Sequence, residues 1–247
     1  MNPKVSIITI VYNGEGLIER TIKSVISQTY SNIDYIIVDG ASTDKTLDVV
    51  KKYGKDISFW ISEPDKGLYD AMNKGLKLAT GDYVWFLNAG DTIFDSSTTE
   101  NVFTKFPHSE IYYGETLIVD LNGDTIGNRR LKAPERLTWK SFRNGMVVCH
   151  QSIIIDKRIT EHYNLGIKVA SDFDWVLKAL KKAKTITNTH QYISRFLDGG
   201  INKQKIPQGL KERFLIMCQH YGVFTSIAFH IPIGIKFFWY WAKNKRF

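Results

Sequence analysis

The sequence predicts an α/β fold built on a Rossmann-like, mainly parallel sheet with an irregular second half. Between residues 5 and 87, apolar runs that read as buried strands alternate with segments of helical periodicity. Each of these runs ends in a cluster of polar residues. After residue 91 the alternation stops and a hairpin signal takes its place. Strand, helix, strand repeats imply right-handed crossovers, parallel strands and helices on both faces.

The first strand is expected over Val5–Val11, a continuous apolar run rich in β-branched residues that is typical of a strand buried on both faces. Apolar residues then recur at helical spacing over residues 17–26. The other expected elements of this half are strands at residues 33–38, 57–61 and 83–87 and helices at residues 47–53 and 67–78.

In the second half, Asn122-Gly123 predicts a hairpin between strands at residues 111–119 and 125–131. Pro134 predicts the start of a short helix, and a strand at 152–155 and a helix at 172–182 follow. Because no linker rich in Gly, Pro or Ser interrupts the chain, we expect one domain over residues 1–205 and a helical tail over 206–247.

The composition excludes several classes of protein. Repeats and low-complexity tracts are absent, which excludes solenoids and collagen-like chains. Two cysteines and a start without a signal peptide indicate a cytoplasmic protein. The net charge of +8 suits anionic partners. The segment from Lys236 to Arg246 contains four cations and no acid, which favours a C-terminal surface contact over a nucleic-acid groove.

Polar residues follow four predicted strands at the point where each ends. In parallel sheets these carboxyl ends share one edge, and ligands bind beyond it. The repetition is the strongest physical sign of a site in the sequence. The residues are Tyr12 and Asn13, then Asp39, then Glu63 and Asp65, then Asn88 and Asp91.

Two of these segments, at Asp39 and at Asp91, suggest chemistry, and each also has an ordinary structural explanation. Asp39 can accept hydrogen bonds from a base or ribose, but it also suits a strand-to-helix turn. Neither a G-x-G-x-x-G nor a P-loop motif is present, so a nucleotide site would be of another kind. Asp91 can hold Mg²⁺ or Mn²⁺ together with substrate phosphates, or can form an Asx-type turn.

Asp172 and Asp174 open a predicted helix, where acids are favoured in any case. Either can act as a general base, but a spacing of two residues points them in different directions. His150-Gln151 follows an apolar run, and a lone buried histidine is more often structural than catalytic.

These motifs together resemble a known family. The stretch VSIITIVYNGEGLIERTIKSVISQTYSNIDYIIVDGASTDKT resembles the start of family 2 glycosyltransferases, which have the GT-A fold. The following SEPDKGLYDAMNKGLKLATGDYVWFLNAGD is similar to the branch that assembles O-antigen, capsule or colanic-acid-like polysaccharides. The resemblance runs from Val5 to about Gly200, and it implies a nucleotide-binding half over residues 1–100 and an acceptor half over 101–205.

The resemblance also implies roles for single residues. Asp172 matches the catalytic base of the family, and Asp39 matches the acid that recognises the nucleobase. Asp91 matches the metal ligand for Mn²⁺ or Mg²⁺. Asn88 is expected to contact ribose or phosphate. The other nucleotide-binding positions are Thr9, Val11, Tyr12, Asn13, Asp65 and Lys66, and His150, Gln151 and Asp174 are assigned to the acceptor side.

One departure from the family pattern concerns the metal. Family members usually show Asp-x-Asp where this chain has Asn88-Ala89-Gly90-Asp91, so one acid remains. The implied reaction is an inverting displacement: Asp172 removes a proton from an acceptor hydroxyl, which attacks the donor sugar, and a nucleoside diphosphate leaves. Two alternatives stay open, a nucleotide-sugar-binding scaffold without turnover and a nucleotidyltransferase.

The expected partners follow from the reaction and from the tail. They are a UDP-, GDP- or dTDP-sugar donor and a saccharide or polyprenyl-diphosphate-linked acceptor, with no nucleic acid. Residues 224–241 are aromatic and precede cations, which predicts contact with an acidic membrane surface at the inner face of the plasma membrane. Packing of this tail on the domain or in a homodimer is the alternative.

Overall fold

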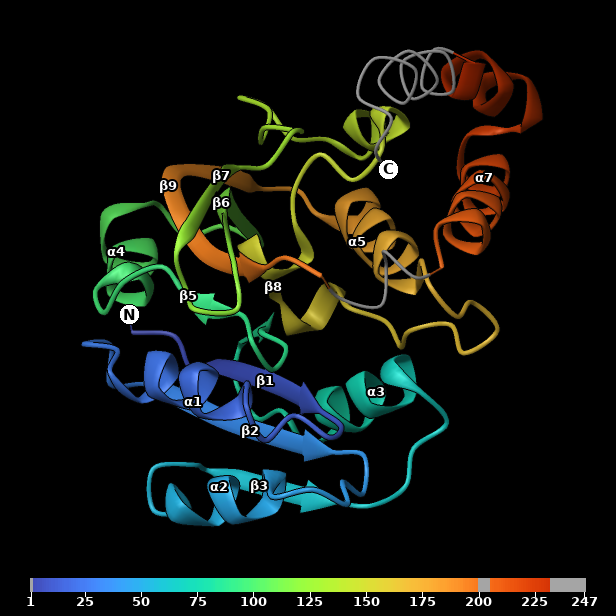
Figure 1. Cartoon of the computed structure of the whole chain (residues 1–247). Helices are drawn as coiled ribbons and strands as arrows, with labels where there is room; N and C mark the ends of the chain where they lie inside the picture. Colours follow the sequence, from blue (N-terminus) through green and yellow to red (C-terminus); the bar gives the residue numbers. More distant parts are fainter. Residues whose placement is uncertain (1, 200–204, 232–247) are drawn as a thin grey trace.

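A computed structural model describes residues 2–199 and 205–231. Within these residues, nine strands form one sheet in the order β3-β2-β1-β4-β8-β6-β9-β5, with β7 paired to β6. Figure 1 shows the first half of the chain, from β1 to α3, on one side of the molecule and the second half packed beside it.

The first half is a parallel sheet. Strand β1 (Val5–Val11) pairs in parallel with β2 (Ile33–Asp39) and β4 (Tyr83–Phe86), and β2 pairs in parallel with β3 (Phe59–Ser62). Every residue of β1 is buried, as expected for a strand covered on both faces. The predicted strand at residues 57–61 exists, but it begins two residues later.

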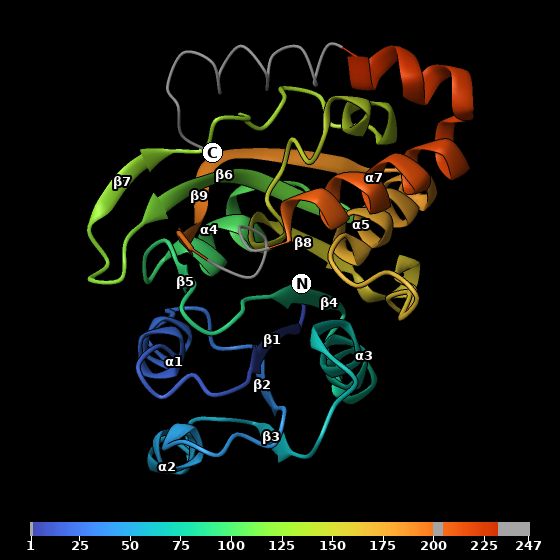
Figure 2. The same cartoon turned by 45° about the vertical axis from the view of Figure 1, so that its right-hand side comes forward.

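Helices cover the two faces of this sheet. Figure 2 shows α1 (Ile18–Ile26) and α2 (Thr46–Lys52) on one face and α3 (Leu68–Leu78) on the other. Successive β1 side chains point to opposite faces of the sheet, so Ile7 packs with α1 and Ile8 packs with α3. A Cβ atom on Gly75 would lie 2.4 Å from Cγ2 of Ile8, so α3 approaches β1 closely because residue 75 is glycine.

The second half continues the sheet with strands of mixed direction. β8 (Ile153–Asp156) pairs antiparallel with β4 and with β6 (Ile111–Val119), and β6 runs parallel to β9 (Ile186–Leu197). The hairpin of β6 with β7 (Thr125–Asn128) confirms the prediction made from Asn122-Gly123. Strand β9, the short β5 (Thr92–Ile93) and helix α4 (Thr98–Lys105) were not predicted.

The short helix predicted at Pro134 is wrong. Pro134 lies in an irregular segment where its carbonyl accepts the Tyr113 hydroxyl. The 3-10 helix η1 (Trp139–Asn144) begins five residues later, because Thr138 and Ser141 form a capping box there. The short 3-10 helices η2 (His150–Ser152) and η3 (Lys157–Ile159) and the α-helix α5 (Ser171–Lys182) follow.

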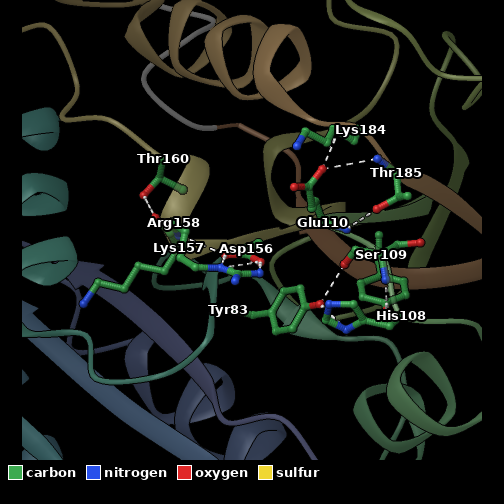
Figure 3. A network of polar contacts seen from close by, with 11 residues as sticks. Tyr83, His108, Ser109, Glu110, Asp156, Lys157, Arg158, Thr160, Lys184 and Thr185 are labelled. Atoms are coloured by element: carbon green, nitrogen blue, oxygen red, sulfur yellow. Dashed lines mark hydrogen bonds and ion pairs between the residues drawn. The ribbon is translucent and has the colours of Figure 1, made fainter.

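A polar network holds the edge of the sheet opposite the predicted site (Figure 3). The Tyr83 hydroxyl donates to the Ser109 carbonyl at 2.7 Å, and Asp156 accepts the Arg158 guanidinium at 2.6 Å. Burial pushes the pKa of Asp156 upward, but the hydrogen bonds from Arg158 outweigh it and keep the pKa below its usual range. Glu110, just before β6, accepts the Lys184 and Thr185 backbone N–H groups that precede β9, so the network joins the starts of β4, β6 and β9.

The C-terminal part of the chain packs on the domain. Helix α7 (Ile206–Tyr221) buries Ile216 and Met217 in the same core as α5, and residues 223–231 are helical. No helix in the described parts of the chain is long and apolar enough to cross a membrane. The cations at 236–246 and most of the predicted interfacial segment lie outside the described residues.

Candidate active site

The loops that follow β1 and β2 are joined by hydrogen bonds. The Asn13 backbone N–H donates to Ser42 Oγ at 2.8 Å, and the Thr43 backbone N–H donates to Asn13 Oδ1 at 2.9 Å. Asn13 has a positive φ of 47°, a conformation that asparagine tolerates better than most residues. Asn13 therefore fixes the shape of both loops at the carboxyl edge of the sheet.

Three residues from three strand ends lie against one another at this edge. A Cβ atom on Gly40 would lie 2.4 Å from Oδ2 of Asp65 and 3.4 Å from Cδ2 of Tyr12. The Tyr12 ring is 65% exposed. Asp65 Oδ1 accepts the Gly67 backbone N–H at 2.7 Å, and the neighbouring Lys66 is exposed. An exposed ring, a carboxylate and a cation thus share one small surface.

Asp39 lies beneath this surface and is fully buried. It accepts the Ser42 hydroxyl at 2.5 Å, the Ser42 backbone N–H at 3.0 Å and the Ser62 hydroxyl at 2.6 Å. The side chains of Thr9 and Val11 are also buried, within the sheet. Thr9, Val11 and Asp39, which were predicted to bind the nucleotide, are therefore buried under the loops and not exposed at their surface.

The segment after β4 places Asp91 in the interior. Asp91 is 4% exposed, and its Oδ1 accepts the Leu197 backbone N–H at 2.9 Å. Burial raises the pKa of Asp91 to about 7, against the opposing effect of hydrogen bonds from Leu197 and the Gln151 side chain. Asn88 Oδ1 is buried without a hydrogen-bond partner among the residues that the structure describes.

His150 and Gln151 are both buried, His150 near Asp172 and Gln151 near Asp91. Gln151 binds the Asp91 carboxylate through its side chain, and its Oε1 accepts the Cys149 thiol at 2.9 Å. His150 Nε2 lies 2.8 Å from the Tyr163 hydroxyl. Burial lowers the pKa of His150 to about 4, although the nearby Asp172 carboxylate acts in the opposite direction. His150 is therefore a neutral residue at pH 7.

Asp172 lies at the start of α5 and is half-buried. Its Oδ1 accepts the Phe173 backbone N–H at 2.9 Å and lies 3.2 Å from the Tyr69 hydroxyl. That hydroxyl also lies 2.7 Å from the Val169 carbonyl oxygen. Within the described residues, the hydrogen bonds to this carboxylate all reach Oδ1.

Asp174 faces a different neighbour. Its Oδ1 lies 2.7 Å from Nε2 of His220 on α7, and its Oδ2 lies 2.8 Å from Nζ of Lys178. Burial pushes the pKa of Asp174 upward, but these two partners outweigh it and lower the pKa. With both oxygens engaged, Asp174 ties α5 to α7, and its assignment to the acceptor side stays a prediction.

Several of the predicted residues lie near one another along the rim. Tyr12 and Asp65 meet over Gly40, the segment after Asp65 leads into Tyr69, and Tyr69 contacts Asp172. His150 then lies near Asp172, and the adjacent Gln151 binds Asp91. The sequence did not single out three participants: Tyr69, Tyr163 and the Leu197 backbone N–H. Tyr69 sits on the apolar face of α3 like a core residue, and a backbone donor leaves no trace in sequence.

Known proteins are similar to this chain in sequence and in fold. The sequence profile described as "Glycosyl transferase family 2" matches residues 6–163. An uncharacterized glycosyltransferase of Mycobacterium tuberculosis is 32% identical over 195 residues, which cover 75% of this chain and 72% of that protein. A PGL/p-HBAD biosynthesis glycosyltransferase of Mycobacterium bovis is 28% identical over 222 residues, covering 85% and 84% of the two chains.

Solved structures show the same fold. Staphylococcus aureus TarS 1-349 in complex with UDP superposes with a TM-score of 0.66 at 21% identity, covering 87% of this chain. This chain spans 65% of the TarS chain. The mannosyltransferase PcManGT of Pyrobaculum calidifontis, in complex with GDP-Man and Mn²⁺, gives a TM-score of 0.64 at 16% identity, covering 95% and 76%. The predicted GT-A fold is confirmed.

The buried environment of His150 predicts an unusual titration. Because its pKa in the folded protein lies below the ordinary value near 6.5, protonation favours the unfolded chain, and this loss of stability sets in as the pH falls from about 6.5 towards 4. NMR of ¹³C-labelled histidine, with the His150→Gln variant for assignment, should show a ring that stays neutral down to about pH 5. A midpoint near 6.5 would contradict the buried placement.

Proposed function

The chain belongs to glycosyl transferase family 2, and on this basis we propose that it is an inverting enzyme that moves a sugar from a nucleoside-diphosphate donor to a saccharide or lipid-linked saccharide. Two contacts on the same rim carry the proposal: Tyr12 and Asp65 meet over Gly40, and the Tyr69 hydroxyl lies 3.2 Å from Asp172 Oδ1. They support a donor surface on the loops and a carboxylate base at the start of α5.

The donor nucleotide is assigned to the loops after β1, β2 and β3. The exposed Tyr12 ring offers a face on which a nucleobase can stack, and Asp65 beside it can accept hydrogen bonds from a base or ribose. Lys66 adds positive charge near the expected phosphates. Proteins of the same fold bind UDP, UDP-GlcNAc and GDP-Man, which supports a donor of this class.

A divalent cation would bind where Asn88 and Asp91 lie. The fit is supported by the buried and unpartnered Asn88 Oδ1, since Mg²⁺ and Mn²⁺ prefer oxygen ligands. The set is small, because no group of three His, Cys, Asp or Glu in the described part of the chain can hold a metal. Donor phosphates and water would complete it. A bound cation would neutralise charge on the departing diphosphate.

Asp172 is proposed as the general base. Its Oδ2 is available to an acceptor hydroxyl, while Phe173 and Tyr69 hold Oδ1 in place. Burial raises the pKa of Tyr69 well above its ordinary value, so this hydroxyl keeps its proton and cannot compete as a base. Asp172 would take the proton as the acceptor oxygen attacks the anomeric carbon, and the configuration there inverts.

Replacing Asp172 with Asn tests this assignment. The amide keeps the shape of the side chain but cannot accept the proton, so turnover should fall by about 10²-fold or more while donor affinity changes little. Turnover is measured by release of nucleoside diphosphate in the presence of acceptor. Asp48→Asn, an exposed acid on α2, is the matched control. Full turnover by Asp172→Asn would remove this residue from the role.

Donor class and metal use can be tested by thermal unfolding with UDP, GDP or dTDP, each with and without Mn²⁺. We expect one nucleotide to stabilise the protein by about 2.7 kcal/mol at a hundred times its Kd, and less without the ion. Gly40→Ala should weaken this binding, because the new methyl displaces Asp65. Gly16→Ala, whose methyl would meet nothing within 4 Å, is the control.

Product analysis with nucleotide sugars and with nucleoside triphosphates separates the alternatives. A scaffold would bind a nucleotide sugar and leave it intact with every acceptor and ion. A nucleotidyltransferase would release inorganic diphosphate from a nucleoside triphosphate. Equal stabilisation with and without Mn²⁺ would contradict the cation assignment alone.

The acceptor is proposed to be lipid-linked and to meet the enzyme at the cytoplasmic face of a membrane. Residues Val223, Phe224, Ile227 and Ile231 are exposed apolar side chains on one short helical stretch, Phe224 at 90%. Beside η1 and the last turn of α5 lies a cleft of about 620 Å³. Its cations are Arg136, Lys140, Lys181 and Lys184. Exposed apolar groups next to such cations suit an acidic lipid surface.

Vesicle sedimentation tests this placement. The protein should bind vesicles that contain acidic phosphatidylglycerol, less at high salt, and bind neutral phosphatidylcholine vesicles weakly. The pair Phe224→Ser and Lys181→Glu should each reduce binding. Lys51→Glu, on the exposed side of α2, is the control for net charge. Binding that ignores both the lipid charge and these substitutions would exclude this surface as the membrane contact.

A further inference from the structure

Three successive backbone N–H groups just before α5 converge on one carboxylate of the C-terminal helix. Lys168 donates to Glu212 Oε1 at 3.1 Å, and Val169 and Ala170 donate to Oε2 at 2.8 and 3.0 Å. Consecutive N–H groups arranged in this way form a concavity that binds anions. Glu212 on α7 fills it, although more than forty residues separate the two segments.

This concavity directly precedes the proposed base. Ala170 is the N-cap residue of α5, and its side chain makes no capping hydrogen bond. Val169 is also held from the other side, because its carbonyl accepts the Tyr69 hydroxyl that lies 3.2 Å from Asp172. The segment is thus fixed by Tyr69 on one side and Glu212 on the other, two residues before the carboxylate that must face the acceptor.

Helix α7 is itself well anchored, so its carboxylate has a fixed position. Ile216 and Met217 are buried in the domain core, and His220 forms the buried pair with Asp174. Gly209 lies beside Val169, where an added Cβ atom would come within 3.2 Å of Val169 Cγ1. Gln208 Nε2 donates to Glu212 Oε1 at 2.8 Å and orients the carboxylate.

The charge of Glu212 suits this role. Burial pushes the pKa of Glu212 upward, but the hydrogen bonds from Gln208 and from the three backbone N–H groups outweigh it and lower the pKa. The carboxylate is therefore ionised at neutral pH. An anion facing three N–H donors makes charge-assisted hydrogen bonds, which are stronger than those between neutral groups.

We propose that Glu212 is a positioning residue for Asp172, and that α7 is for this reason a working part of the catalytic unit. This inference rests on the proposed function, since it needs Asp172 to act as the base. Glu212 touches neither donor nor acceptor. It holds residues 168–170, and through them it sets where Oδ2 of Asp172 lies.

The test is Glu212→Ala, assayed with and without added formate. Removing the carboxylate should lower kcat by about tenfold to a hundredfold, with the donor KM nearly unchanged, because small displacements of a reacting group are costly. Formate can enter the vacated concavity and should restore kcat in part. Wild-type turnover should not respond to formate, and chloride at equal ionic strength should not restore the variant. Gln219→Ala, an exposed position on the same helix, is the control.

The outcomes separate this inference from the function on which it rests. A wild-type kcat in Glu212→Ala, with only a lower Tm, would overturn the positioning role and leave the function standing. A loss of kcat that formate does not relieve, in a protein folded by circular dichroism, would also overturn it. Full turnover by Asp172→Asn would instead defeat the proposed base, whatever Glu212→Ala shows.

Discussion

The burial of β1 on both faces is the constraint on which the rest of the structure depends. A strand without a polar face must be covered by helices on each side, and parallel neighbours joined by crossovers meet that need. One consequence is that four strands end at the same edge. Every loop that carries a candidate site residue in the first half begins there, so the site follows from how the core is covered.

The acids at this edge divide into two kinds. Asp39 and Asp91 are buried and accept hydrogen bonds from neighbouring loops, so their first contribution is to hold those loops in place. Asp65 and Asp172 are partly exposed, and Oδ1 of each accepts a backbone N–H from a residue close by in the chain. Burial therefore distinguishes the two acids that hold neighbouring loops from the two that we propose to act in binding and catalysis.

The predictions from sequence were most accurate where a local pattern decides the structure. The apolar run Val5–Val11 and the Asn122-Gly123 turn signal are local patterns. The strand and the hairpin that they predict are both present. Strand β9 was missed because its pairing with β6 is long-range and its residues alternate irregularly. The helix start predicted at Pro134 was wrong because the capping box lies four residues later, at Thr138, and the 3-10 helix η1 begins there.

For the site, the sequence identified the residues at the strand ends but not how deeply they are buried. Asp91 looks the same in sequence whether it faces solvent or the Leu197 N–H. The contacts of Tyr69 with Asp172 and of Glu212 with Lys168 join residues 103 and 44 positions apart, which no spacing rule connects. The boundary drawn at residue 205 was reasonable from composition, yet the hydrogen bonds of Glu212 cross it.

The tie between α5 and α7 bears on how such a chain can diversify. A C-terminal extension that only covered the surface would be free to drift, shorten or be exchanged between relatives. Here the helix supplies acceptors that the preceding loop lacks and a histidine partner for an interior acid. Recombination at residue 205 would consequently separate two pieces that each leave polar groups without partners.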